Sequence, residues 1–184
     1  LTVELTAALR ETSIPTDSLV QIWIEDAQMN DDDLLNSIGF SSYRDLWQMR
    51  CKFPPNGEGI ATRPFICGVD NEAFLEVNSR AFSWHPEQGS LDSTKLNNLF
   101  KEEWFDDKGF LLLEVENRLA GFCWTKVHHQ GDLILGEIYA IAVDPDFHGR
   151  GFGKPLTTSG LSYLSSVGAD LGMLYVEADN KPAV

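Results

Sequence analysis

Basic residues are scarce in this sequence. Its 184 residues include 14 Lys and Arg against 28 Asp and Glu, which gives a formal net charge of −14 at pH 7. A protein with so negative a field is poorly suited to neutralise nucleic-acid phosphates or to dock on anionic lipid. We therefore expect neither nucleic acid nor a membrane as a partner. An anionic small ligand would have to be held by backbone amides or by a few local cations.

Long apolar runs and cysteine pairs are also absent. No stretch of about eighteen apolar residues occurs, and the opening residues LTVELTAALRET follow the period of a helix rather than the order of a signal peptide. The three cysteines, Cys51, Cys67 and Cys123, form no CxxC pair and have no metal-cage spacing. We expect a soluble protein of the reducing cytoplasm, and a monomer, although nothing in the sequence fixes the oligomeric state.

Two clusters resemble metal sites only superficially. The acidic run 31–33 follows Asn30. An N-cap with acidic residues at the positive end of a helix explains this run, each charge contributing roughly 0.3 to 1 kcal/mol. His128 and His129 are adjacent on an expected strand, so their side chains point to opposite faces, and a role beside a turn is favoured. We expect no metal cofactor.

Composition and spacing predict a folded chain of two parts. With 43% hydrophobic and 11% aromatic residues the chain can bury a core, and its length admits one domain plus a fragment. The segment 53–59, FPPNGEG, holds two prolines and two glycines and is expected to be a linker. Residues 1–55 are predicted to be the C-terminal remnant of a first repeat, and residues 56–184 a second repeat that lacks its last helix and strand.

The first part shows local patterns and a similarity to the end of the chain. Residues 20–24 predict a strand, Asn30 begins a helix that Gly39 ends, and residues 42–50 predict a closing strand. Residues 1–25 align with residues 156–177, with a three-residue difference between helix and strand, which indicates an internal repeat. Both repeats are expected to be truncated.

The second part has the pattern of an α/β domain. Asp70 and Asp92 are predicted N-caps, and so is Asp179 or Asn180. Helices are predicted at residues 70–82, 92–102 and 154–167. Strands are predicted at residues 63–68, 110–115, 119–128, 135–143 and 173–177. The three central strands are separated by turn sequences and should form an antiparallel meander.

The strongest pattern is residues 141–156, IAVDPDFHGRGFGKPL, in which a strand runs through a glycine loop into a helix. Glycines at 149, 151 and 153 permit positive φ and close backbone approach to an anion, and the free N–H groups of the helix start point at it. Arg150 and Lys154 add local positive charge. The pattern suits a pyrophosphate. It is neither GxxxxGK[ST] nor GxGxxG, so nucleotide hydrolysis and dinucleotide binding lose their usual fingerprints.

A strand ending in Val-Asp-Pro, followed by His-Gly-Arg-Gly-Phe-Gly and a helix, resembles the acyl-CoA binding motif of the GNAT family of N-acetyltransferases. His148 stands where that family carries Gln or Arg. A subgroup of the family with two tandem repeats is similar to this chain at residues 36–49, 81–89, 103–106, 121–128, 136–139 and 174–180. The resemblance implies a GNAT acyltransferase fold, α/β, with a mixed and largely antiparallel sheet, flanking helices and a splay at the cofactor strand.

The resemblance also implies a reaction. In that subgroup the acetyl group of acetyl-CoA passes to the free amine of a cysteinyl-glucosaminyl-inositol, the last step in making a low-molecular-weight thiol. We therefore expect an acetyl-CoA-dependent N-acetyltransferase with a small-molecule acceptor. Two alternatives stay open: a different acceptor, either another small amine or a protein N-terminus, and an inactive module that only binds acetyl-CoA.

Carried over by position, the resemblance implies two adjoining sites. The acceptor site would hold Glu87, Lys126, Glu137 and Tyr175. The acetyl-CoA site would comprise the pantetheine strand Ile141, Ala142 and Val143, the pyrophosphate loop His148, Gly149, Arg150, Gly151, Phe152, Gly153 and Lys154, and the bordering residues Asn180, Lys181, Pro182, Ala183 and Val184. A tyrosine that usually protonates the departing thiolate would lie beyond Val184.

Glu137 is the favoured proton acceptor in this scheme, although a solvent-facing or ion-paired strand residue would show the same pattern. General-base help contributes roughly 10² to 10⁴ in rate, whereas holding amine and thioester together supplies effective molarities of about 10⁵ to 10⁸ M. Positioning should therefore dominate. Cys123 has no His–Asp pattern near it, so we expect direct transfer rather than an acyl-enzyme. Trp84, Trp104 and Trp124 are assigned no catalytic role.

Overall fold

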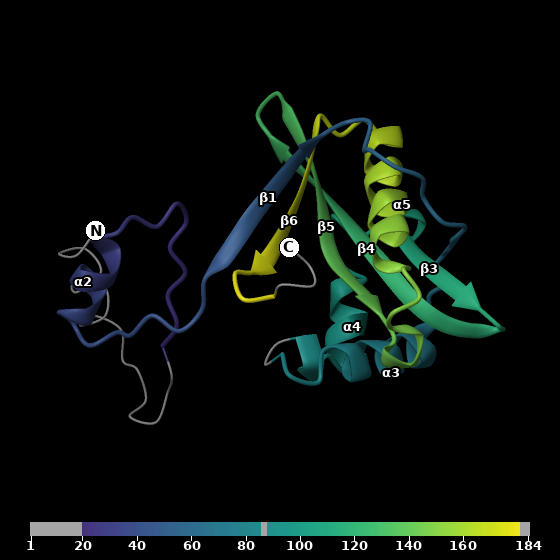
Figure 1. Ribbon diagram of the computed structural model, residues 1–184, viewed down its shortest axis with the longest axis horizontal. Helices are drawn as coiled ribbons and strands as arrows, with labels where there is room; N and C mark the ends of the chain where they lie inside the picture. The colour runs from purple at the N-terminus through teal and green to yellow at the C-terminus, as the bar shows by residue number, and fades with distance from the viewer. Residues whose placement is uncertain (1–19, 86–87, 181–184) are drawn as a thin grey trace. The chain divides into compact units, whose positions relative to one another are not determined.

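The computed structural model describes residues 20–85 and 88–180 and divides into two units, one up to Asp45 and one from Leu46 onward (Figure 1). Within the first unit, helix α2 (Asp31–Asn36) begins after Asn30, as predicted. The N–H of Gln28 donates to Asp31 Oδ2 at 2.7 Å, so the acidic run closes the turn that leads into the helix. The helix ends earlier than predicted, with Ser37 as its C-cap, and Gly39 follows with φ 95°.

The strand predicted for residues 20–24 is wrong. These residues belong to no strand, because none of the described residues of their unit forms a neighbouring strand to pair with. The repeat alignment that matched residues 22–25 to the end of the chain therefore gains no support from this segment. The rest of the aligned segment, residues 1–19, lies outside the described residues.

Strand β1 (Leu46–Lys52) belongs to the second unit. The sequence placed a strand at 42–50 and counted it with the first part, but β1 starts later and pairs antiparallel with β6 (Leu171–Glu177) along its whole length, from Leu46 opposite Glu177 to Lys52 opposite Leu171. Backbone pairing with β6, rather than the proline-rich linker, therefore decides where the second unit begins. The linker itself contains no helix or strand, as predicted.

The second unit is built on a six-stranded sheet with the order β1-β6-β5-β4-β3-β2. The other strands are β2 (Arg63–Pro64), β3 (Phe110–Val115), β4 (Arg118–Gln130) and β5 (Leu133–Val143). All neighbours are antiparallel except β5 and β6. The predicted meander is confirmed as β3–β4–β5. The strand predicted at 63–68 is only two residues long, because the chain turns at Ile66, whose carbonyl accepts from both Val69 and Asp70.

Three helices flank this sheet: α3 (Asn71–Ala81), α4 (Ser93–Leu99) and α5 (Gly153–Ser166). Short 3₁₀ turns occur at η1 (Gln88–Ser90), η2 (Asp107–Gly109) and η3 (Pro145–Phe147). Asp92 caps α4 by accepting from the N–H of Lys95, as predicted, although α4 ends at Leu99. Asp70 stands before α3 but caps nothing, because its carboxylate instead binds the Arg63 guanidinium at 2.7 and 2.8 Å.

The two faces of the sheet carry separate hydrophobic clusters. On one face, Phe122 and Trp124 of β4 pack with residues of α3 and α4; on the other, Cys123 packs with residues of α5. Alternate residues of a strand point to opposite faces, so β4 holds both layers together. Gly160 on α5 is required by this packing, since a Cβ atom there would lie 2.3 Å from the Cys123 sulfur.

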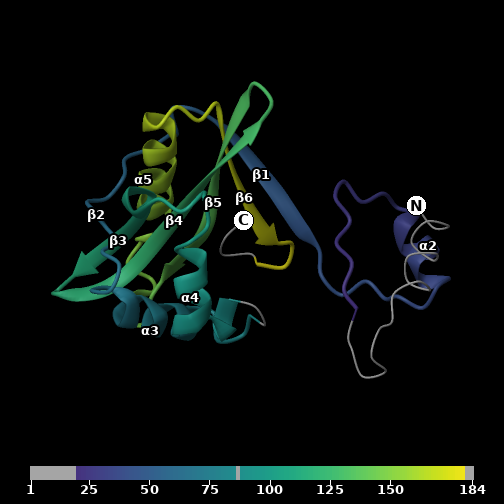
Figure 2. The same cartoon turned by 180° about the vertical axis from the view of Figure 1, so that it is seen from behind.

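Strands β5 and β6 pair over only part of their length. Their parallel pairs run from Leu135 opposite Leu171 to Ile138 opposite Leu174. Beyond that point β5 continues beside β4 alone and β6 continues beside β1, so the two strands diverge (Figures 1 and 2). The register between β4 and β5 also shifts between Trp124 and Thr125, which leaves Tyr139 as an extra residue on β5. The predicted splay is confirmed.

Candidate active site

The loop between β5 and α5 depends on glycine for its backbone shape. Gly149 and Gly151 have φ values of 76° and 78°, in the left-handed region that disfavours other residues. A Cβ atom at either position would meet no heavy atom within 4 Å. These glycines are thus required by backbone conformation rather than by crowding, and the surface above them is open to a ligand.

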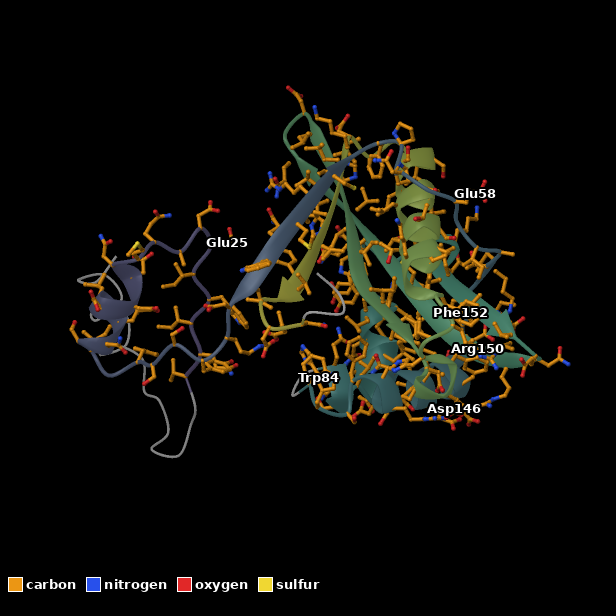
Figure 3. All side chains as sticks on the ribbon, in the orientation of Figure 1. Glu25, Glu58, Trp84, Asp146, Arg150 and Phe152 are labelled. Carbon is orange, nitrogen blue, oxygen red and sulfur yellow. The ribbon has the colours of Figure 1, made fainter. Side chains whose placement is uncertain are left out.

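The start of α5 presents free backbone donors to this open loop. The first amides of an α-helix have no acceptor inside the helix, and they lie at the positive end of its dipole. Phe152 occupies the N-cap position and makes no side-chain cap. Figure 3 shows Asp146, Arg150 and Phe152 gathered around this turn. Arg150 pairs with Glu116 at 3.2 Å and remains half exposed, and Lys154 is exposed, so both cations can reach a ligand.

His148 fastens this loop to the strand before it. Its Nε2 lies 2.9 Å from the carbonyl oxygen of Val143, the last residue of β5. The imidazole therefore stabilises the turn. His148, which differs from the family pattern, thus uses its side chain to bind the backbone of this chain.

A cluster of charges, absent from the sequence-based site, supports the same loop. Asp144 is buried; it accepts from the N–H of Asp146 at 2.9 Å and lies 3.3 Å from Arg80. Asp146 bridges Arg80 and Arg118 at 2.7 Å each. Hydrogen bonds from Arg80, and then from Arg118, lower the pKa of Asp146 to about 2. The cluster ties α3 and β4 to the turn that leads into the glycine loop.

The last residues of β5 offer an unpaired backbone edge. Ile141, Ala142 and Val143 are half-buried and pair on one side with β4, opposite Cys123, Phe122 and Gly121. In the part of the chain that the structure describes, no strand covers their other edge. An extended ligand arm could hydrogen-bond along this edge, in the way that a peptide adds to a sheet.

Three of the predicted acceptor residues share one face of the sheet. Glu137 on β5, 8% exposed, lies directly opposite Lys126 on β4 and opposite Met173 on β6. Tyr175 lies two residues further along β6, on the same face, and its hydroxyl accepts from Gln48 Nε2 at 2.7 Å. The structure thus brings Lys126, Glu137 and Tyr175 to the face that also carries Trp124.

His128 is a residue of this face that the sequence interpretation missed. Its Nε2 lies 2.5 Å from Glu137 Oε2. The role beside a turn was wrong for His128, because β4 runs on to Gln130 and places His128 within the strand. If the hairpin turn is placed at Gly131, the strand register puts Lys126 opposite Glu137 and His128 diagonal to Glu137. The contact between His128 and Glu137 could therefore have been predicted from the hairpin sequence.

Aromatic rings surround the lysine of this face. Lys126 Nζ lies 4.6 Å from the ring centroid of Trp104 and 5.7 Å from that of Tyr139. Trp104 in turn packs against Tyr139 at 4.9 Å and against the buried Trp124 at 5.8 Å. The ammonium group is therefore held by ring faces, a cation–π arrangement. Trp84 is 59% exposed and takes no part in this cluster.

The remaining predicted site residues are only partly described. Glu87 and residues 181–184 lie outside the described residues. Asn180 closes the turn after β6, its N–H donating to the carbonyl oxygen of Glu177 at 3.0 Å.

Cysteine, metal and membrane features can be placed as well. Burial raises the pKa of the Cys123 thiol to about 12, so this side chain is held in the weakly nucleophilic thiol form. Among the described residues no three His, Cys, Asp or Glu side chains are grouped to hold a metal ion. No helix in the described ranges has the length and apolar character needed to cross a membrane.

Comparison with known proteins gives matches in sequence and in structure. The model of the acetyltransferase (GNAT) family matches residues 72–184. Mycothiol acetyltransferases of Actinosynnema mirum and Pseudarthrobacter chlorophenolicus are 42% and 44% identical over 98% and 83% of this chain. A GCN5-related N-acetyltransferase structure from Sphaerobacter thermophilus superposes with a TM-score of 0.68 at 23% identity, covering 88% of this chain and 51% of its own.

These matches cover different shares of the proteins compared. The chain spans 62% of the length of the Actinosynnema mirum relative and 50% of the Pseudarthrobacter chlorophenolicus relative. The predicted family resemblance and the predicted fold, with its mixed sheet and flanking helices, are both confirmed.

Proposed function

Because the chain belongs to the acetyltransferase (GNAT) family, we propose that it transfers the acetyl group of acetyl-CoA to the free amine of a cysteinyl-glucosaminyl-inositol. This is the reaction that the sequence resemblance implies, and relatives at 42% and 44% identity bear the name mycothiol acetyltransferase. The acceptor is a small molecule, in keeping with that name.

One observation carries the proposal: Glu137 is buried next to the point where β5 leaves β6. The last parallel pair joins Ile138 to Leu174, directly after Glu137. A thioester laid along the free edge of residues 139–143 would bring its acetyl carbon to the end of that edge, beside the carboxylate. The amine and the activated acyl group would then meet beside the buried carboxylate of Glu137.

The residues of the loop fit acetyl-CoA. Gly149 and Gly151, the free amides at the start of α5, and the cations Arg150 and Lys154 suit a diphosphate in a protein whose overall charge would repel one. Ile141, Ala142 and Val143 suit the amide-containing pantetheine arm, because no described strand pairs with their outer edge. When bound, acetyl-CoA supplies an acetyl group activated as a thioester.

Glu137 would act on the amine. An α-amino group with a pKa of about 7.7 to 8.0 is only about a tenth to a sixth neutral at pH 7, so a carboxylate in contact with it would accept the proton that the amine must lose before it attacks. The neutral nitrogen then forms a bond to the acetyl carbon and the carbon–sulfur bond breaks. The nitrogen loses a second proton as the amide forms, the sulfur leaves as a thiolate, and the thiolate takes up one proton, so that the products are the amide and CoA in its thiol form. Lys126 and Tyr175 line the same face and would orient the acceptor.

The direct test is turnover of a defined acceptor. The chain is incubated with acetyl-CoA and cysteinyl-glucosaminyl-inositol, and the product is identified by mass spectrometry as the acceptor plus one acetyl group. Because the acceptor carries its own thiol, release of CoA cannot be followed with a thiol reagent alone. Alkylating the product thiol before analysis distinguishes an acetylated amine from an acetylated sulfur.

Two control acceptors complete this test. An acceptor whose amine is already blocked should give no product, and a peptide with a free N-terminus should react far more slowly. Binding of acetyl-CoA without turnover of any amine would contradict the proposal and would fit an inactive cofactor-binding module. Faster turnover of the peptide would move the assignment to a protein N-terminus as acceptor.

A further inference from the structure

The carboxylate of Glu137 has one hydrogen-bonding neighbour among the side chains that the structure describes. His128 Nε2 lies 2.5 Å from Glu137 Oε2, within hydrogen-bonding distance. Lys126, although opposite Glu137 in register, directs its ammonium group to the rings of Trp104 and Tyr139. The buried carboxylate is therefore held through one oxygen by one imidazole.

This contact leaves the second carboxylate oxygen available. A glutamate side chain rotates about three bonds, and a free one samples several orientations that differ by more than the reach of a hydrogen bond. Fixing Oε2 from the neighbouring strand limits Glu137 to orientations in which Oε1 is presented to the same face. Small misplacements of a reacting group cost up to about 10²-fold in rate, so such a constraint matters to the reaction.

We propose that His128 is a positioning residue for the transfer reaction: its Nε2–H donates to Glu137 Oε2 and so holds Oε1 toward the acceptor amine. The inference rests on the proposed function, in which Glu137 accepts the amine proton. It goes further in assigning a task to a residue that the family resemblance placed in neither the acetyl-CoA site nor the acceptor site. His128 lies in β4 opposite Leu135 of β5, and this backbone pairing holds it beside Glu137 on the neighbouring strand.

The kinetic test compares three variants. His128→Leu removes the donor, and we expect kcat to fall roughly ten- to hundredfold while KM for acetyl-CoA stays within about twofold. His128→Gln keeps an N–H donor at a similar reach and should recover most of the lost kcat. His129→Leu is the matched control, because His129 is adjacent and exposed, and its alternation places it on the opposite face; it should behave as the unchanged chain does.

A second measurement does not depend on turnover. In the unchanged chain, ¹⁵N NMR of the imidazoles should show His128 in a single Nε2–H form and the exposed His129 as an averaged mixture of both forms. Loss of kcat in His128→Leu together with its recovery in His128→Gln would support the positioning role. Unchanged kcat in His128→Leu, equal loss in His128→Gln, or an averaged mixture at His128 would each overturn it.

These outcomes separate the inference from the proposed function. A chain that acetylates no amine but shows the single Nε2–H form at His128 would refute the proposed reaction while leaving the hydrogen bond intact. A chain that turns over the acceptor with His128 in an averaged mixture would keep the proposed reaction and refute the positioning role.

Discussion

The two halves of β5 differ in what they expose. Residues 135–138 have a strand on each side, so their backbone groups are hydrogen-bonded within the sheet. Only their side chains, including that of Glu137, are available to a ligand. Residues 141–143 have a strand on one side only and lead into a loop of glycines, so here one backbone edge has no neighbouring strand among the described residues. One strand thus offers side-chain chemistry at one end and backbone recognition at the other.

The difference has an energetic origin. A buried carboxylate is costly unless it is hydrogen-bonded, and Glu137 meets this requirement with His128. The other half consists of residues 141–143 and the glycine loop that follows, and is called the loop half below. It would bind a ligand through backbone amides, whose dipoles attract an anion despite the net charge of −14. Substitutions in the two halves should therefore affect different steps of the proposed reaction.

The largest effect is expected at Glu137. Glu137→Gln keeps the shape and removes the base, so we expect kcat to fall by roughly 10² to 10⁴ and the pH profile of the remaining activity to move upward. Acetyl-CoA binding, measured by isothermal titration, should stay nearly intact because the loop half is untouched. An unchanged pH profile would remove Glu137 from the role of base, and a large loss of acetyl-CoA affinity would contradict the division between the halves.

The matching change in the loop half is Gly151→Ala. Gly151 has φ 78°, where a Cβ atom costs about 1 to 2 kcal/mol. We expect acetyl-CoA to bind about tenfold more weakly, while kcat at saturating acetyl-CoA stays close to its original value.

Gly168→Ala is the control for backbone strain. Gly168 has φ 91° and follows the other end of α5, with nothing within 4 Å of its missing Cβ. Both variants should lose similar stability in thermal unfolding, but only Gly151→Ala should lose affinity for acetyl-CoA. Equal affinity losses would show that general destabilisation, rather than the loop, is responsible.

An effect smaller than that at Glu137, and similar in size to that at Gly151, is expected at Lys126, in the side-chain half. Lys126→Met keeps the apolar stem against Trp104 and removes the charge, so KM for the acceptor should rise about tenfold, corresponding to about 1.4 kcal/mol. The affinity for acetyl-CoA should not change. Lys108→Met, at an exposed lysine of η2, serves as the control. If Lys126→Met weakened the binding of acetyl-CoA and Lys108→Met did not, the assignment of Lys126 to the acceptor site would be contradicted.

The smallest effect concerns the charges under the loop half. The pKa of Asp146 is lowered to about 2 by Arg80 and Arg118, so its contribution to stability is complete above its ordinary value of about 3.8 and is lost as the pH falls from there toward about 2. Asp146→Asn should therefore be slightly less stable at pH 7 and lose less stability across that acid window. Because these side chains are largely exposed, added salt should shrink the difference in urea unfolding.

Much of this arrangement could be predicted from the sequence because it is local. Turn residues and alternation define the β3–β4–β5 meander, and glycines followed by a helix define the loop. The failures arise where a partner outside the element decides the outcome. Strand β1 was assigned to the wrong unit because its partner β6 is distant in sequence. Asp70 was expected to cap α3 but pairs with Arg63 instead.

The candidate site shows the same difference between local patterns, which were predicted, and contacts between elements, which were not. A family resemblance assigned Lys126, Glu137 and Tyr175 to the acceptor site, and the strand pairing of the structure brings these three residues to one face. His128 was missed because it was judged by its neighbour His129 rather than by the strand opposite. A charge cluster also joins three elements; its members are Arg80, Arg118, Asp144 and Asp146. The spacing of these residues along the chain does not predict their contacts.

Titration of the ¹⁵N-labelled chain with acetyl-CoA, followed through its backbone amide resonances, tests the central claim most directly. The account predicts the largest shifts at Gly149, Gly151 and Gly153 and at residues 141–143, with Gly168, after the other end of α5, unaffected. Saturable binding that leaves the resonances of the loop and of residues 141–143 unmoved would contradict it.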